Sequence, residues 1–276
     1  MILVTGGAGQ LGTAFRRVLP QAGYIDVDDL DLGRADLLAA ALEEMRPEAI
    51  FNCAAYTAVD RAEAEEALAT VVNGRAVGVM AEHAARRHIP LLTFSTDYVF
   101  PGDGREPYLE SSPTDPVNAY GRSKLAGERA ALAVYPEALV VRTSWLVSGT
   151  HPNFVATMLR LAGEGPVRVV DDQRGCPTMA ADLAPAAWAA LQAGVSGILH
   201  LTNSGEASWF DLARAAVALA GLDPERVVPC ATADYPTPAR RPAYSVLGSE
   251  RRRPLGLPEL PPWQESLPAV VEGLRR

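Results

Sequence analysis

The stretch ILVTGGAGQLG, residues Ile2 to Gly12, decides the fold of this chain of 276 residues. Its first part, Ile2–Gly6, is a short apolar run that ends in glycine, which is typical of a buried strand. Apolar side chains then recur at helical spacing from Leu11 to Leu19. The stretch therefore predicts a strand, a tight turn and a helix in succession.

The turn carries three glycines, Gly6, Gly9 and Gly12, in the order G-x-x-G-x-x-G. Glycine permits a turn with unusual φ, a close approach of the backbone to a phosphate, and close packing of the helix on the strand. The free N–H groups and the dipole at the start of a helix attract negative charge. At a first strand–helix junction, this pattern predicts binding of a dinucleotide through its pyrophosphate.

Strands and helices continue to alternate along the first half of the chain. Apolar runs predict strands over Ala49–Ala55, Pro90–Thr96 and Ala138–Trp145. Segments dense in Ala, Leu, Glu and Arg predict helices over Ala35–Met45, Glu63–Arg87 and Gly121–Tyr135. Such alternation is typical of βαβ units. The fold class that we expect is α/β, with a Rossmann-type doubly wound parallel sheet and a smaller C-terminal α/β lobe that binds substrate.

The pattern loosens after about Ser148. Loop-like segments alternate there with predicted helices over Ala180–Gln192 and Trp209–Ala220, and the tail RPLGLPELPPW is rich in proline. We therefore assign residues 1–147 and about 177–202 to the dinucleotide-binding domain. Residues from about 148 to 176, together with residues 203–276, are assigned to the substrate lobe.

Composition narrows the classes of partner. A net charge of −8 and a pI near 5.1 give no basic surface for nucleic acid, and no long apolar run indicates a membrane. The segment MILVTGG starts directly as a strand and has none of the features of an export signal, so we expect a cytoplasmic protein.

Cysteine and histidine give no sign of a metal site. The three cysteines, Cys53, Cys176 and Cys230, are too few and too scattered for a disulfide framework, and no metal-ligand spacing is present. The four histidines are expected to be solvated or structural: His83, His88, His151 and His200.

The segment NAYGRSKLAG contains Lys124, the only lysine of the chain. Tyr120 lies four residues earlier, so the two side chains share one face of the predicted helix. A nearby ammonium favours phenolate, and we expect it to lower the pKa of Tyr120 from its usual value of about 10. The phenol would then suit proton transfer near neutral pH. Lysine, unlike the planar arginine fork, is a compact rotatable donor that can also reach ribose hydroxyls.

Thr96 and Asp97 end a predicted strand, where open α/β sheets bind ligands. We expect Thr96 to bond the substrate oxygen beside Tyr120 and Asp97 to accept from a sugar hydroxyl. The structural alternative is an ST-turn that closes the strand.

Four aspartates, Asp26, Asp28, Asp29 and Asp31, follow the second predicted strand. A carboxylate there can accept from the ribose 2′-hydroxyl of NADH and would repel the 2′-phosphate of NADPH. A solvated acidic turn is the alternative.

Seven segments in order along nearly the whole chain carry a family resemblance: TGGAGQLG (Thr5–Gly12), NCAAYTAVDRAE (Asn52–Glu63), STDYVFPGDG (Ser95–Gly104), NAYGRSKLAGE (Asn118–Glu128), RTSW (Arg142–Trp145), DDQRGCPT (Asp171–Thr178) and YPTPARRPAYS (Tyr235–Ser245). Together they resemble the dTDP-4-dehydrorhamnose reductase family of the extended short-chain dehydrogenase/reductase superfamily. The Tyr-x-x-x-Lys pair alone indicates the superfamily, whereas STDYVFPG, RTSW and PTPARRP point to this family.

The resemblance implies a reductase that passes hydride from NADH or NADPH to C4 of dTDP-4-dehydro-6-deoxy-L-mannose. The product would be dTDP-L-rhamnose for cell-surface polysaccharide. Tyr120 would donate the proton, Lys124 would tune it and hold the nicotinamide ribose, and Thr96 would adjust the phenol and the substrate oxygen.

The resemblance also assigns binding residues. Cofactor contacts are implied for Gly9, Gln10 and Leu11 at the pyrophosphate, Asp31 and Leu32 at the adenine side, and Ala55, Tyr56 and Thr57 at the nicotinamide half. Sugar contacts are implied for Asp97 and Trp145. The guanidinium groups of Arg240 and Arg241 suit the substrate diphosphate, with a solvated surface pair as the alternative.

The chain departs from the family pattern at two places. Tyr244 precedes Ser245 where members often carry asparagine, which puts a polar contact from that position in doubt. Some members form Mg²⁺-bridged dimers through a glutamate early in the first helix, where this chain has Ala14. We therefore expect a homodimer only as one option and regard a required Mg²⁺ as doubtful.

Two other functions fit much of the same pattern. A sugar-nucleotide epimerase or dehydratase would use the same turn and Tyr-x-x-x-Lys pair but would retain its NAD. A non-catalytic dinucleotide-binding regulatory subunit, similar to the partner of methionine adenosyltransferase, also resembles this family. The presence of Thr96, Tyr120 and Lys124 favours a catalyst.

Overall fold

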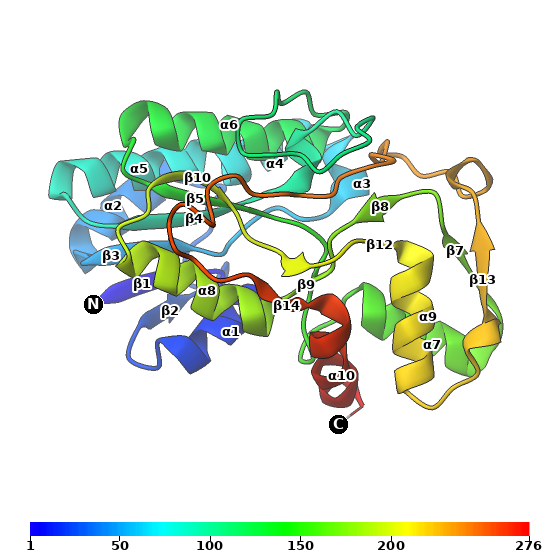
Figure 1. Cartoon of the computed structure of the whole chain (residues 1–276). Coiled ribbons are helices and arrows are strands. Elements are labelled where there is room, and N and C mark those ends of the chain that lie inside the picture. The colour runs from blue at the N-terminus through cyan, green and yellow to red at the C-terminus, as the bar shows by residue number, and fades with distance from the viewer. Residues whose placement is uncertain (276) are drawn as a thin grey trace.

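A computed structural model describes residues 1–275 and has a six-stranded parallel sheet at its centre (Figure 1). The strand order is β10-β5-β4-β3-β1-β2, and every neighbouring pair runs parallel. The bounds are β1 Ile2–Thr5, β2 Gly23–Ile25, β3 Ala49–Asn52, β4 Leu91–Thr96, β5 Leu139–Thr143 and β10 Gly197–His200. The predicted parallel sheet is confirmed, with strands slightly shorter than the apolar runs.

The helices around this sheet are α1 Gln10–Val18, α2 Ala35–Met45, α3 Val59–Ala62, α4 Glu66–Thr70, η1 Val71–Arg75, α5 Ala76–Arg87, α6 Ala119–Val134 and α8 Ala180–Gln192. The helix predicted over Glu63–Arg87 is present as α4, η1 and α5, of which η1 is a π-helical turn. A Cβ on Gly127 of α6 would lie 2.1 Å from the Asn73 carbonyl of η1. Glycine therefore lets α6 lie directly against the π-helical turn.

Helices cover both faces of the sheet. Successive strand residues point to opposite faces, so Val4 and Phe51 pack toward α1 and α8, whereas Leu3 and Ile50 pack toward α2, α5 and α6. All four of these side chains are fully buried. The doubly wound arrangement expected from near-continuous apolar strands is confirmed.

The strand order reverses at β1, because β2 lies on one side of it and β3 on the other. Ligands of open α/β sheets bind outside the carboxyl ends of the strands at such a reversal. The chain leaves β1 at Gly6 and β3 at Cys53, so these two segments form the floor of any ligand site at that edge.

A smaller lobe lies beside the carboxyl edge of the sheet, with α7, α9 and α10 in one group (Figure 1). Its longer elements are α7 Phe154–Glu164, β7 Val167–Val170, α9 Trp209–Leu219, β13 Val227–Cys230 and α10 Trp263–Leu274. We did not predict α10, which directly follows the proline-rich run that ends at Pro262. β7 and β13, each of four residues, pair parallel to one another.

Short elements connect the two parts of the molecule. They are β6 Leu146–Val147, η2 Asp97–Val99, β8 Arg174–Gly175, β9 Thr178–Met179, β11 Asn203–Ser204, β12 Ala207–Ser208, η3 Pro224–Arg226, η4 Thr232–Asp234 and β14 Leu260–Pro262. β6 pairs with β9, β8 with β12, and β11 with β14. The loop expected over Asp171–Thr178 thus contains a strand, because β8 finds a partner that is distant in sequence.

Part of the C-terminal segment returns to the large sheet domain. Tyr108 N–H donates to the Val246 carbonyl at 2.9 Å, and Leu247 packs among Phe100, Tyr108 and Leu125. The division of the chain at the predicted domain boundaries stays a prediction. None of the helices within residues 1–275 combines the length and the apolar character needed to span a bilayer.

Candidate active site

A cleft of about 1300 Å³ runs along the carboxyl edge of the sheet and is lined by side chains from both parts of the molecule. Among the residues expected to bind ligand or act on it, fifteen line this cleft: Gly6, Gly9, Gln10, Leu11, Asp31, Leu32, Ala55, Tyr56, Thr57, Thr96, Asp97, Tyr120, Lys124, Trp145 and Arg241. Gly12 and Arg240 do not line it. The volume is sufficient for a dinucleotide with a second ligand beside it.

The glycine turn has the geometry that a pyrophosphate requires. Gly6 has φ +66°, and a Cβ there would lie 2.6 Å from the Ala54 N atom. Gly9 is the N-cap of α1, so the first N–H groups of the helix are directed out of its end. Gly12 lies beneath the turn, where a Cβ would be 2.1 Å from the Gly6 carbonyl oxygen. Gly12 therefore serves packing rather than ligand contact, and the turn fits a bound phosphate.

The acidic loop after β2 reaches the cleft through Asp26 and Asp31. Asp26 accepts from Ala8 N–H at 2.7 Å and so ties the loop to the glycine turn. Asp29 accepts from Asp26 N–H at 2.9 Å, and Asp31 accepts from Gly33 N–H at 2.8 Å. The carboxylates fold the loop itself, yet Asp26 and Asp31 also lie where an adenosine ribose would be expected.

The segment after β3 is held from behind by Asn73 of the π-helical turn. Tyr56 N–H donates to Asn73 Oδ1 at 2.8 Å, and Asn73 Nδ2 donates to the Tyr56 carbonyl at 3.0 Å and to Ser123 Oγ at 2.9 Å. Asn73 thus joins the segment that carries Ala55, Tyr56 and Thr57 to the helix that carries Tyr120. Sequence reasoning missed it, because its significance depends on contacts between distant segments.

Tyr120 and Lys124 occupy the first two turns of α6. The helix begins at Ala119, two residues before the predicted start, because Asn118 caps it by accepting from Gly121 N–H at 2.8 Å. Tyr120 also packs edge-to-face on Tyr98 with ring centroids 5.9 Å apart. Both Tyr120 and Lys124 line the cleft, as their i, i+4 spacing predicts.

The expected lowering of the Tyr120 pKa is wrong for this structure. The pKa of Tyr120 is raised to about 12, mainly by burial and also by the Asp97 carboxylate, while the nearby Thr96 hydroxyl opposes the rise. Burial likewise lowers the pKa of Lys124 to about 8, against the attraction of Glu128 and Cys53. A low-polarity site disfavours phenolate and ammonium alike. At neutral pH Tyr120 is therefore a protonated donor beside a lysine that is still mostly charged.

Thr96 and Asp97 lie at the end of β4 as expected. Thr96 Oγ1 donates to Asp97 Oδ1 at 2.9 Å and accepts from Tyr98 N–H at 3.2 Å, so the ST-turn is present as well as the cleft position. Burial raises the pKa of Asp97 to about 7, and the Ser245 and Thr96 hydroxyls oppose that rise. Within residues 1–275, Asp97 Oδ2 is buried and accepts no hydrogen bond of normal geometry. This oxygen is available to a ligand hydroxyl.

Trp145 forms an aromatic wall of the cleft. Its backbone has φ +47°, which is unusual for a bulky residue, and its ring stacks on Trp209 at 3.6 Å between centroids. A Cβ on Gly175 would lie 2.5 Å from the Trp145 ring, so glycine is required behind it. Such local strain at a cleft is typical of a functional position.

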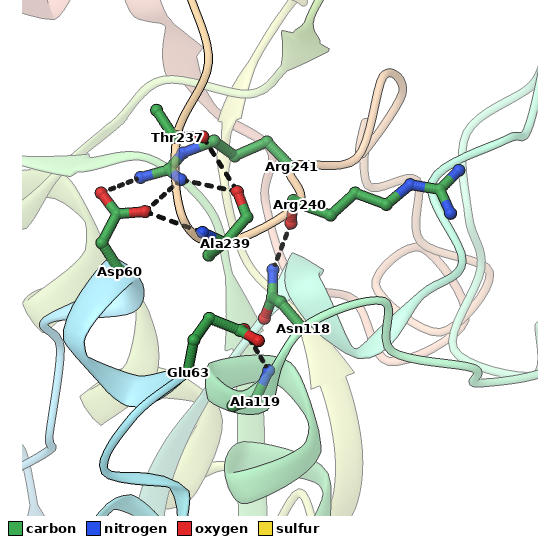
Figure 2. A network of polar contacts seen from close by, with 8 residues as sticks. All are labelled: Asp60, Glu63, Asn118, Ala119, Thr237, Ala239, Arg240 and Arg241. Carbon is green, nitrogen blue, oxygen red and sulfur yellow. Dashed lines mark hydrogen bonds and ion pairs between the residues drawn. The ribbon is translucent and has the colours of Figure 1, made fainter.

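The two arginines of the PTPARRP segment have different surroundings (Figure 2). Arg241 lines the cleft and forms a two-pronged ion pair with Asp60, at 2.6 Å and 2.9 Å. Arg240 is exposed and its side chain points away from the other residues drawn. Its carbonyl accepts from Asn118 Nδ2 at 2.9 Å. A role for the Arg240 side chain at the substrate diphosphate thus has no support from its position.

The small lobe supplies a wall that sequence reasoning missed. Its cleft residues are Phe154, Met158, Arg168, Val169, Val170, Gln173, Trp209, Tyr235 and Thr237. The alternation of apolar and polar residues in β7 could have indicated this wall, since Val167 and Val169 are buried whereas Arg168 is exposed. His151 also lines the cleft, and its Nε2 lies 2.7 Å from the Ala8 carbonyl oxygen. This is a structural role, one of the two that were expected, and it joins the lobe to the glycine turn.

Residues 1–275 contain no cluster of three or more His, Cys, Asp or Glu side chains suited to an ion. The groups that the cleft does present include a phenol, an ammonium, carboxylates and hydroxyls.

Comparisons with known proteins agree with this geometry. A family model described as RmlD substrate binding domain matches residues 1–276. The chain is 43% identical to the dTDP-4-dehydrorhamnose reductase of Burkholderia thailandensis, over 99% of this chain and 98% of that protein. It is 42% identical to a dTDP-4-keto-6-deoxy-D-glucose reductase of Streptomyces niveus, over 96% of this chain and 94% of that protein.

A solved structure also carries a ligand. The crystal structure of dTDP-4-dehydrorhamnose reductase from Bacillus anthracis str. Ames in complex with NADP has a TM-score of 0.91 and 36% identity to this chain. The match covers 96% of each chain. The large domain and the small lobe are thus both present in that relative.

Proposed function

The chain belongs to the dTDP-4-dehydrorhamnose reductase family, and from this premise we propose that it reduces the C4 ketone of dTDP-4-dehydro-6-deoxy-L-mannose to dTDP-L-rhamnose with NADH or NADPH. One observation supports the proposal most strongly. Tyr120, Lys124 and Thr96 come from α6 and β4 yet line a single cleft together with the glycine turn.

The residues of the cleft perform the proton chemistry of this reduction. When bound, the nicotinamide supplies the hydride to C4 of the sugar. Negative charge then develops on the ketone oxygen, and the Tyr120 phenol donates its proton to that oxygen. The transfer is favourable because an alkoxide is a stronger base than a phenolate. Lys124 stabilises the phenolate that remains until solvent returns a proton.

Thr96 and Asp97 orient the sugar beside Tyr120. The Thr96 hydroxyl lies close enough to Tyr120 to lower the pKa of the phenol, which brings the phenol beside the end of β4. Asp97 Oδ2 can accept from a sugar hydroxyl, and the Trp145 ring can pack on a sugar face. These contacts would hold C4 in line with the hydride donor.

Loss of NADH absorbance on addition of the 4-keto sugar nucleotide tests the proposal. We expect one NADH or NADPH consumed per ketone reduced, and no loss when the sugar nucleotide is omitted. An epimerase or dehydratase would regenerate its NAD and show no net loss. A regulatory subunit would bind the dinucleotide without turnover.

The same assay also tests which configuration of the 4-keto sugar the protein reduces. One similar relative is named for reduction of dTDP-4-keto-6-deoxy-D-glucose, which differs from the L-mannose compound in ring stereochemistry. Comparison of kcat/KM for the two 4-keto sugars distinguishes these substrates. A cytoplasmic location, expected from the N-terminal segment, and a homodimer, expected from the family resemblance, remain predictions.

A further inference from the structure

Residues 237–245 cross the substrate side of the cleft, and we call this segment the strap. It has no helix or strand of its own. It nevertheless contacts three separate parts of the active site, and Figure 2 shows the first two of these contacts.

The first contact joins the strap to α3. Arg241 Nη1 donates to Asp60 Oδ1 at 2.6 Å, and Nη2 donates to Asp60 Oδ2 at 2.9 Å. Ala239 N–H also donates to Asp60 Oδ1 at 3.1 Å, and Arg241 Nη1 donates to the Ala239 carbonyl at 2.9 Å. The Arg241 guanidinium lowers the pKa of Asp60, so the carboxylate stays ionised. One carboxylate thus fixes both the backbone and the side chain of the strap.

The second contact joins the strap to the start of the catalytic helix. Asn118 is fully buried, and its Nδ2 donates to the Arg240 carbonyl while its Oδ1 caps Gly121 N–H. Glu63 accepts from Ala119 N–H at 2.8 Å. The strap and Glu63 therefore both hold the first turn of α6, which carries Tyr120.

The third contact joins the strap to the segment that follows β4 and η2. Tyr244 N–H donates to the Gly102 carbonyl at 3.0 Å, and Gly102 has φ +81° with no room for a Cβ against Pro242. The buried Ser245 follows, and its hydroxyl is close enough to Asp97 to lower the pKa of that carboxyl. Asp97 is in turn bonded to Thr96.

From these contacts we propose that the strap positions Tyr120, Thr96 and Asp97 for catalysis, and that the Asp60–Arg241 ion pair keeps the strap seated. The inference rests on the proposed function for its kinetic test. Asp60 and Arg241 are positioning residues here. Three of the five N–H donors of the Arg241 guanidinium are used within the protein, one on each Asp60 oxygen and one on the Ala239 carbonyl.

A double-mutant cycle tests the pairing. We expect Asp60→Asn and Arg241→Gln each to lower kcat about 10- to 100-fold, since small misplacements of reacting groups have costs of this order. The double variant should be no worse than either single variant, because both remove the same contact. The Kd for NADH should stay within about twofold, as the glycine turn is not part of the strap.

Arg122→Gln is the matched control. Arg122 forms the same kind of two-pronged pair with Glu66, at 2.7 Å and 2.9 Å, and lies two residues after Tyr120 on α6. Neither Arg122 nor Glu66 lines the cleft. Its kcat should match that of the unaltered protein.

Two kinetic outcomes would overturn the proposal. If the fold-losses of kcat in the two single variants multiply in the double variant, the two side chains act separately. The other outcome is a raised KM for the sugar nucleotide in Arg241→Gln alone, together with a normal kcat in Asp60→Asn. It would indicate that Arg241 binds the substrate diphosphate.

Hydrogen exchange keeps the proposal testable if the protein does not turn over the expected sugar. Amides of residues 237–245 should exchange faster in Asp60→Asn and in Arg241→Gln than in Arg122→Gln. Equal protection in all three variants would contradict the seated strap. Absence of turnover in the unaltered protein would instead contradict only the proposed function.

Discussion

At the scale of single residues, burial governs the chemistry of the site. The same low-polarity surroundings raise the pKa of Tyr120 and lower the pKa of Lys124. Burial thus favours the neutral form of each group, although Lys124 is still mostly charged near pH 7. For a reduction this suits the direction of proton flow, because the phenol must carry a proton when the ketone oxygen becomes basic.

Tyr120→Phe tests the proton donor. We expect kcat for the 4-keto sugar to fall by about 10²–10⁴-fold, the usual contribution of a positioned acid. Affinity for NADH should be retained, because only the phenol oxygen is lost. Steady-state kinetics and fluorescence titration with NADH measure the two quantities. A kcat within a few-fold of normal would remove Tyr120 from the role.

Lys124→Met tests the cost of the buried ammonium. The unfolded chain holds this proton up to about pH 10.5, whereas burial lowers the folded pKa to about 8. Below pH 8 the folded state therefore contains a charge that water would solvate better, and the free energy of unfolding rises with pH between these two values. The variant should be more stable by up to about 3 kcal/mol near neutral pH.

Urea unfolding of the ligand-free proteins near neutral pH and at about pH 10 measures this difference. The advantage of the variant should shrink at the higher pH, while its turnover is poor at both. An advantage that does not change with pH would show that the pKa of Lys124 is the same in the folded and the unfolded chain, as for a solvated ammonium.

At the scale of elements, close packing at glycine positions sets where α1 and α6 lie. The Gly12 Cα position faces the Gly6 carbonyl, and Gly127 faces the Asn73 carbonyl, each with room for hydrogen only. The first brings α1 onto β1 so that its N-terminus reaches the cleft. The second brings α6 onto the π-helical turn so that Tyr120 lies beside the segment after β3.

Gly12→Ala tests the packing of α1. An added Cβ would be 2.1 Å from a backbone oxygen, so the helix must shift away from the turn. We expect a lower melting temperature and a clear loss of NADH affinity. Gly163→Ala, in α7 with nothing within 4 Å, should instead be neutral or stabilising. Equal behaviour of the two variants would contradict this account.

At the scale of the whole molecule, the cleft is a joint product of the sheet and the small lobe. Strand ends supply the glycine turn, Thr96 and the segment after β3, and the lobe supplies residues such as Arg168 and Trp209. His151 and the strap connect the two sides directly. A ligand that fills the cleft therefore contacts both parts and favours their packed arrangement.

Ligand binding should accordingly raise the melting temperature of the protein. At a dinucleotide concentration about 100 times Kd, the folded state gains about 2.7 kcal/mol. For a chain of this size that corresponds to a rise of roughly 5–10 °C. Calorimetry with NADPH or NADH, then with dTDP added, measures the effect. A melting temperature that neither ligand changes would contradict a binding site that spans both parts.

Much of this protein follows from its sequence alone. Apolar runs and helical spacing are local properties, so they determined the parallel sheet, the bounds of α2 and α8, and the position of the glycine turn. The same holds for Tyr120 and Lys124, since a spacing of four residues fixes a shared helix face. Elements that depend on distant partners, such as β8, gave no usable local signal, and α10 was missed because it directly follows a proline-rich run.

The tertiary structure alone decided how the site behaves. It placed Arg241 against Asp60 and directed Arg240 away, although the two are adjacent in sequence and identical in type. It also reversed the expected direction of the Tyr120 pKa shift, because burial outweighs a nearby charge. Burial and contact between distant segments arise only when the chain is packed, and no local pattern encodes them.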